Sequence, residues 1–108
     1  MITLVRSNLE SILWACQRFD VERLWIFGSA LRDDWIEGRS DVDFVAEFGK
    51  SDLSLFRQHM GLIVQLQDIL GIDVDVIDSR SMKKVEFIEE VRRTRELLYE
   101  RSHRAISA

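Results

Sequence analysis

Two short runs of this sequence combine residue types that can handle phosphates. The first is Gly28-Ser29-Ala30-Leu31-Arg32, which follows the β-forming run Leu24–Phe27. A strand that ends in a tight Gly-Ser turn and enters a short helix leaves backbone N–H groups free to bind an anionic phosphate. The second run is Ser40-Asp41-Val42-Asp43, which starts another stretch of β-formers. The two runs together predict parts of one phosphate-binding site.

Two carboxylates make the second run chemically distinctive. Asp41 and Asp43 lie two residues apart, so on a strand they project from the same face. Neighbouring carboxylates repel each other unless a cation lies between them, and Mg²⁺ with its oxygen ligands is the usual partner. A phosphate-binding turn beside such a pair suits phosphoryl or nucleotidyl transfer. The alternative is that these acids only cap turns and strand ends.

The length and composition bound the kind of protein. A chain of 108 residues predicts a single domain over residues 1–108, and 46% hydrophobic with 31% charged residues is an ordinary globular mix. The apolar runs are shorter than the roughly 18 residues of a membrane span, and residues 1–11 lack a secretory signal pattern. Cys16 is the single cysteine and falls in an apolar helical stripe, so we expect a buried thiol and a cytoplasmic protein.

The charge is unevenly distributed along the chain. Residues 1–79 carry seven basic and fourteen acidic side chains, whereas residues 80–108 carry eight basic and five acidic ones. A nucleic-acid substrate would require a broad basic surface, so the acidic part argues against direct nucleic-acid binding. The basic part is interpreted as a solvated helix surface, with contact to RNA or to an acidic protein as the alternative.

Helical and strand periodicities alternate along the chain, which predicts an α/β (α+β) domain. Helices are expected at 7–19, 30–34, 53–70 and 81–93, and strands at 22–27, 41–48 and 72–78. Residues 96–99 fit either a last strand or a continuation of the preceding helix. Ser51, Asp52 or Ser54 is expected to cap the longest helix, and Gly71 to end it. The apolar face expected for that helix consists of Phe56, Met60, Ile63, Val64, Gln67 and Leu70.

The two phosphate-handling runs also carry a family resemblance. G-S-x-x-R followed by S-D-x-D resembles the signature of the DNA-polymerase-β-type nucleotidyltransferases. The short chain is similar to the minimal nucleotidyltransferase (MNT) group, known chiefly as the antitoxin half of HEPN–MNT pairs. The resemblance covers residues 9–99. It implies the nucleotidyltransferase fold, a small mixed β-sheet with helices packed against it.

The family takes a third carboxylate from a later strand, in a pattern such as Val-Asp-Leu-Val. Val74-Asp75-Val76-Ile77 matches that pattern and indicates Asp75. Asp73 shares the face of Asp75 on a regular strand, whereas Asp78 points the opposite way. These two acids are the rival candidates.

The resemblance implies a role for each of these side chains. Asp41 and Asp43 would hold two Mg²⁺ ions on the triphosphate of ATP, and Asp75 would help bind the catalytic ion and draw the proton from the attacking hydroxyl. Gly28 would let the backbone approach the phosphates, and Ser29 would donate its hydroxyl and N–H to them. An ordinary turn with Ser29 as a helix cap is the alternative for the last two residues.

Arg32 and three tryptophans are less clearly assigned by the sequence. Arg32 lies one helical turn after the Gly-Ser pair, where it would either neutralise the triphosphate or pair with nearby acids. Trp35 suits nucleobase stacking or a partner contact, although packing as a lid over the core is the preferred interpretation. Trp14 and Trp25 are expected in the core.

The resemblance implies an enzyme, a Mg²⁺-dependent protein adenylyltransferase. It would transfer AMP from ATP to a tyrosine hydroxyl of a cognate HEPN ribonuclease toxin, and the two chains would form a hetero-oligomer away from any membrane. The alternative is a non-catalytic antitoxin that neutralises the toxin by masking it. A third possibility, a small-molecule nucleotidyltransferase, would require an additional substrate-binding domain for which 108 residues leave no room.

Overall fold

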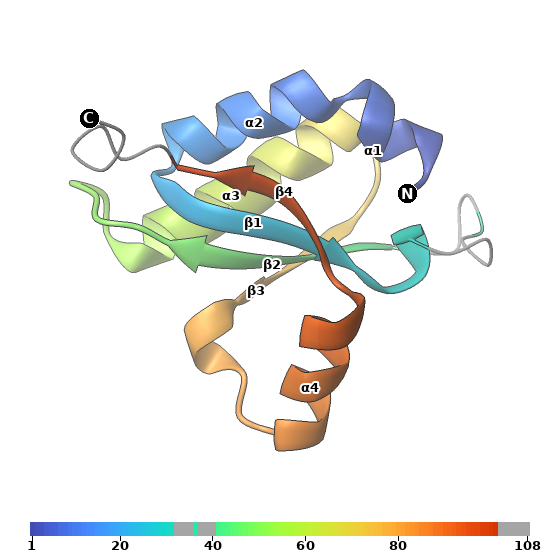
Figure 1. The fold of residues 1–108 in the computed structure, drawn as a ribbon. Coiled ribbons are helices and arrows are strands. Elements are labelled where there is room, and N and C mark those ends of the chain that lie inside the picture. The colour runs from blue at the N-terminus through green and yellow to red at the C-terminus, as the bar shows by residue number, and fades with distance from the viewer. Residues whose placement is uncertain (32–35, 37–40, 102–108) are drawn as a thin grey trace, which may run out of the picture.

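The computed structural model describes residues 1–31, 36 and 41–101 (Figure 1). The strands of this described part are β1 (Val21–Phe27), β2 (Val42–Phe48), β3 (Val74–Asp78) and β4 (Glu96–Glu100). They form one sheet in the order β3-β2-β1-β4, in which β1 is antiparallel to both of its neighbours and β2 is parallel to β3. The expected small mixed sheet is confirmed.

Helices cover both faces of this sheet. The α-helices are α1 (Thr3–Ser7), α2 (Leu9–Arg18), α3 (Leu55–Leu70) and α4 (Val85–Thr94), and two 3₁₀ turns are η1 (Gly28–Leu31) and η2 (Ser79–Ser81). Figure 1 shows α2 and α3 on one face of the sheet and α4 on the other. In the part of the chain that the structure describes, no helix is long and apolar enough to cross a membrane.

The larger core lies between the sheet and the α2/α3 layer. Alternate residues of β2 point into it, and Val42 and Phe44 are fully buried there. Cys16 of α2 belongs to the same cluster, and burial raises the pKa of its thiol to about 12. The thiol therefore packs as a small apolar group, as the sequence predicts.

A smaller core fills the opposite face beneath α4. Trp25 of β1, Val45 of β2 and Val91 of α4 form it, and Trp25 is confirmed as a core residue. The guanidinium of Arg95 lies 4.1 Å from the centre of the Trp25 ring, close enough for a cation–π contact. The residues of β2 whose side chains point to this face are therefore partly covered by α4.

The ends of α3 follow the sequence, but its buried face does not. The Ser54 hydroxyl accepts a hydrogen bond from the Arg57 N–H at 3.2 Å, and Gly71 ends the helix with a left-handed φ of 71°. The buried side chains of the helix recur every four residues: Gln58, Leu62, Leu66 and Leu70. The predicted apolar face of this helix is wrong for three of its residues, because Phe56, Met60 and Val64 are exposed. Trp14, which was expected in the core, is 49% exposed as well.

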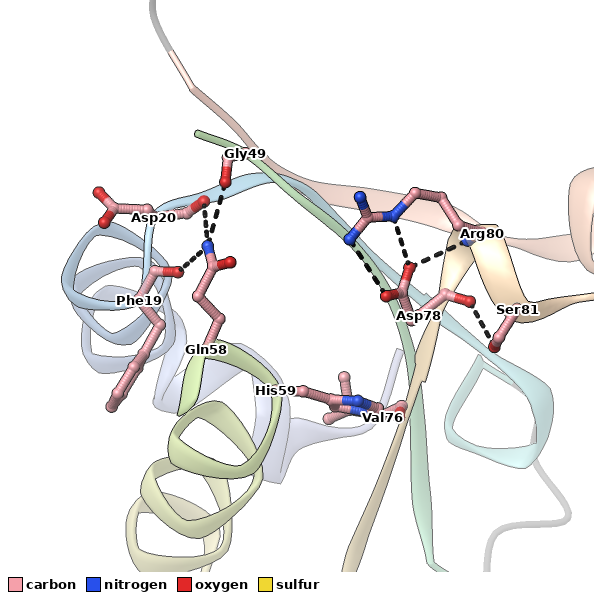
Figure 2. Close-up of polar contacts among 9 residues, drawn as sticks. All are labelled: Phe19, Asp20, Gly49, Gln58, His59, Val76, Asp78, Arg80 and Ser81. Atoms are coloured by element: carbon pink, nitrogen blue, oxygen red, sulfur yellow. Dashed lines mark hydrogen bonds and ion pairs between the residues drawn. The ribbon is translucent and has the colours of Figure 1, made fainter. Parts of the chain in front are cut away.

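A buried amide explains which face of α3 turns inward. Gln58 Nε2 donates to the carbonyl oxygens of Phe19, Asp20 and Gly49 at 3.0, 3.3 and 3.1 Å (Figure 2). These carbonyls belong to the turn between α2 and β1 and to the end of β2. Burying them unpaired would be costly, so the polar contact holds this side of the helix against the sheet.

The outer edge of β3 is also covered by side chains of α3. His59 Nε2 lies 2.5 Å from the carbonyl oxygen of Val76, and Gln67 Oε1 accepts a hydrogen bond from the N–H of Val74 at 3.4 Å. Figure 2 shows the His59 ring against Val76. Residues 74 and 76 carry the backbone groups that point away from β2 in the parallel ladder.

Other boundaries differ from the expectations by a few residues. The first predicted helix is divided, because Asn8 has non-helical dihedrals and separates α1 from α2. The short helix expected from Ala30 begins earlier, as η1 at Gly28. The helix expected from Ser81 begins at Val85, and residues 96–100 form a strand. The β4 pairing with β1 settles that open alternative in favour of the strand.

We expect replacement of Gln58 by Leu to destabilise the protein by about 2 kcal/mol, because it removes the donor of the Phe19 and Gly49 carbonyls, while the Asp20 carbonyl keeps the N–H of Gly49. Urea denaturation measures the effect. Gln17 on the exposed side of α2 provides the matched control, and its replacement by Leu should change the unfolding free energy by less than about 0.5 kcal/mol. Equal effects of the two substitutions would contradict the role given to the buried amide.

Candidate functional site

The parallel pairing of β2 with β3 brings two of the predicted acids together. Asp43 stands opposite Asp75 in the register, and residues opposite each other in neighbouring strands point to the same face. Val42 and Val74, their neighbours along the strands, are buried on the α2/α3 side. Successive residues of a strand point to opposite faces, so Asp43 and Asp75 lie on the α4 face, near one end of the sheet. Asp43 is half-buried there and Asp75 is exposed.

The glycine turn passes directly beside Asp43. Gly28 has a φ of 79°, which disfavours any residue with a side chain. A Cβ placed on Gly28 would lie 3.0 Å from Asp43 Oδ2. The backbone of η1 therefore runs next to this carboxylate, and the N–H of Ile2 braces the turn by donating to the Ala30 carbonyl at 2.9 Å.

The carboxylates interact electrostatically across this small space. The pKa of Asp43 is raised from 3.8 to about 6, first because burial removes water from the carboxylate and then because Asp75 and Asp41 are negatively charged. Asp41 itself is exposed and directly precedes β2. These three residues form what we call the carboxylate row.

A divalent cation fits this donor set. Its charge would offset the repulsion from Asp75 and Asp41, which adds to the effect of burial on the Asp43 pKa, and carboxylate oxygens are the ligands that Mg²⁺ prefers. Within residues 1–31, 36 and 41–101, no three His, Cys, Asp or Glu side chains converge closely enough to form a ready metal cluster.

The structure separates the rival acid Asp78 from the carboxylate row. Asp78 is 8% exposed and points to the α3 side of the sheet, where its Oδ1 accepts a hydrogen bond from the Arg80 N–H at 3.0 Å and its carboxylate pairs with the Arg80 guanidinium (Figure 2). It caps η2. Asp73 directly precedes β3, and its charge is not among the causes that raise the pKa of Asp43.

Two of the residues singled out in the sequence fall outside the described part of the chain, and one residue beside Asp43 was not predicted. Arg32 and Trp35 lie outside the described residues, and Ser29 is placed only by its backbone within η1. Phe27 was not predicted beside the site, although it stands opposite Asp43 in the β1/β2 register and packs edge-on against Phe87 of α4, with ring centres 6.1 Å apart. Only the strand register reveals it, and residue spacing alone carries no such signal.

Comparison with solved structures identifies the class of fold. A structure described as a "putative minimal nucleotidyltransferase" matches with a TM-score of 0.71 at 29% identity, over 85% of this chain and 90% of that chain. A toxin–antitoxin structure with AMP-PNP has a TM-score of 0.68 at 21% identity, over 87% of this chain and 74% of that one. A structure of a tri-AMPylated Shewanella oneidensis HEPN toxin in complex with MNT antitoxin has a TM-score of 0.61 at 19% identity, over 89% and 72%. The fold is that of the nucleotidyltransferases.

Sequence comparison then gives the family. A family model described as "Polymerase beta, Nucleotidyltransferase" matches residues 10–104, so the chain belongs to the polymerase-β-type nucleotidyltransferase family. A protein of Methanocaldococcus jannaschii named "Putative protein adenylyltransferase" is 34% identical over 65 residues, which span 60% of this chain and 64% of that protein. The matched part is thus slightly under two thirds of the relative's length.

The raised pKa of Asp43 predicts a pH-dependent stability. The folded protein holds this proton more tightly than the unfolded chain, so stability falls as pH rises from about 4 to about 6 and stays lower above that range. Asp43→Asn removes the charge. It should stabilise the metal-free protein by on the order of 1 kcal/mol above about pH 7, after allowance for solvent screening, and by nothing near pH 4.

Thermal unfolding of wild type and variant across this pH range is the measurement. Asp73→Asn is the matched control, because it removes a nearby exposed charge that does not contribute to the Asp43 shift. Identical pH profiles for the two variants would show that the carboxylates do not interact as described.

Proposed function

We propose that this chain is a Mg²⁺-dependent protein adenylyltransferase that acts as an antitoxin. It would transfer AMP from ATP to a tyrosine hydroxyl of a cognate HEPN ribonuclease toxin, with which it forms a hetero-oligomer in the cytoplasm. The observation that carries the proposal is the carboxylate row beside the Gly28 turn. The family membership and the AMPylated toxin in the Shewanella oneidensis complex support it.

The residues of the turn and of the carboxylate row each have a part in the proposed reaction. The turn at Gly28 and Ser29 would bind the phosphates through backbone N–H groups, while Asp41 and Asp43 would hold Mg²⁺ ions against them. When bound, the metal supplies positive charge that stabilises the negative charge developing on the phosphates. The Asp75 carboxylate would help bind the catalytic ion and would accept the proton of the attacking hydroxyl.

The balance of the reaction is simple. The tyrosine oxygen forms a bond to the α-phosphorus of ATP, and the bond from that phosphorus to the bridging oxygen breaks. Pyrophosphate leaves with the bonding electrons, and the hydroxyl proton passes through Asp75 to water. Docking of a whole protein would place the hydroxyl, so orientation would provide a large part of the rate.

Two substitutions on β3 test which of its acids takes part in the reaction. Asp75→Ala should lower AMP transfer by about 10²-fold or more and remove most of the thermal stabilisation by Mg²⁺-ATP. Asp78→Ala should keep transfer and the Mg²⁺-ATP response, while costing about 1 kcal/mol of stability through loss of the η2 cap. Loss of AMP transfer in Asp78→Ala alone would show that Asp78, and not Asp75, is the acid that takes part in the reaction.

Intact-mass spectrometry of the toxin tests the activity itself. After incubation with Mg²⁺-ATP, the toxin should gain the mass of one AMP or a small multiple with the wild-type chain, and nothing with Asp41→Asn/Asp43→Asn. The double variant should still bind the toxin, because it changes only the carboxylate row. An unmodified toxin whose ribonuclease activity is nevertheless blocked would favour masking.

A further inference from the structure

The outer face of α3 exposes a row of large apolar side chains. Phe56 is 72% exposed, Met60 42% and Val64 61%, and they recur every four residues along one side of the helix. Single exposed apolar residues are common on proteins, but a continuous row is not. We call these three residues the outer stripe.

The outer stripe borders a groove between α2 and α3, which lie side by side in Figure 1. The groove has a volume of about 490 Å³, and Phe19 and Leu53 line it together with the stripe. Its floor is well defined, because a Cβ on Gly61 would collide with the Phe19 ring. At the rim, the Arg18 guanidinium lies over the rings of Phe19 and the exposed Trp14, at 5.7 and 5.4 Å.

Two opposite charges flank the outer stripe. Arg57 and Asp68 are both exposed, and neither forms an ion pair with any residue in the described part of the chain. They are eleven residues apart, about three helical turns, so they lie on the same side of α3. Each stands two residues from its end of the helix, so the two charges are equidistant from the helix midpoint.

This pattern is complementary to itself. If a second α3 lies antiparallel across the first, with a two-fold axis near the helix midpoint, Arg57 of each copy meets Asp68 of the other. Met60 of each copy then meets Val64 of the other, and Phe56 reaches toward the far end of the second helix. Such contacts are isologous, which is the arrangement of most protein dimers.

We propose that the outer stripe and its groove form a homodimer interface, occupied by a second copy of this chain with α3 packed antiparallel. A partner of a single charge sign would leave either Arg57 or Asp68 unmatched, whereas a second copy pairs both. Symmetry also doubles the contribution of each aromatic side chain, and Phe56 with Trp14 provides a large share of the roughly 1,200 Å² that a stable interface requires.

The interface is separate from the carboxylate row. The row lies on the α4 face of the sheet, whereas the outer stripe lies on the far side of the α2/α3 layer. Both sites of the dimer would therefore remain open to solvent. The inference does not rest on the proposed function, and AMP transfer can be measured independently of dimerisation.

The test is sedimentation of the full chain over a concentration series, with thermal melts to verify folding. The wild type should reach twice the monomer mass of 12.7 kDa. Val64→Asp places two like charges near the axis and should leave a folded monomer. R57D and D68R should each raise the dimer dissociation constant about tenfold, since two pairs per dimer become repulsive, and the R57D/D68R double variant should restore it.

Three results would overturn the proposal. The first is a wild type that remains monomeric at every concentration, which would leave the groove to a different protein. The second is a dimer that Val64→Asp does not weaken. The third is a double variant that is no tighter than the single ones, which would show that Arg57 and Asp68 do not meet.

Discussion

Repulsion between carboxylates held side by side is the constraint on which this protein's site depends. Asp43 and Asp75 belong to strands joined in parallel register, and the ladder holds their backbones side by side. Behind them, Val42, Phe44 and Val76 are packed in the larger core, which keeps the strands fixed. Burial raises the pKa of Asp43, and the negative charges of Asp75 and Asp41 raise it further. The fold is thus stabilised on one face of the sheet and holds an unfavourable charge arrangement on the other.

The strand register is what aligns these acids. A shift of β3 by one residue would turn Asp75 toward α3 and bring Asp78 to the α4 face. His59 and Gln67 of α3 oppose such a shift, because they contact the carbonyl of Val76 and the N–H of Val74. The polar contacts of α3 and its apolar packing therefore act together on the geometry of the carboxylate row.

Much of the sheet and of the site follows from local pattern. Alternation along β2 predicts that Asp43 lies opposite the core, and the same argument separates Asp75 from Asp78 on β3. Pairing across strands is not local, so the position of Phe27 beside Asp43 was not predicted. What the sequence leaves open at the site lies in the segment around Arg32, outside the described residues.

The helices show where periodicity fails. The longest helix has apolar residues on two neighbouring sides, and hydrophobicity alone does not show which side faces the sheet. The buried Gln58 settles the question, although a glutamine counts as polar in any apolar pattern. α4 starts later than expected, because the chain first forms η2, which Asp78 caps, and then extended backbone at Met82 and Lys84. The bonds of Gln58 to Phe19 and Asp20 join residues far apart in the sequence, so local periodicity carries no signal of them.

The side chains that cover β3 have a consequence for how the protein behaves among its own copies. β3 is an edge strand, and an uncovered edge can template another strand and so promote aggregation. Its outward N–H at Val74 and its outward carbonyl at Val76 are occupied by Gln67 and His59. These two contacts cover part of the outer edge of the strand that carries Asp75, so that edge is less open to pairing with a foreign strand.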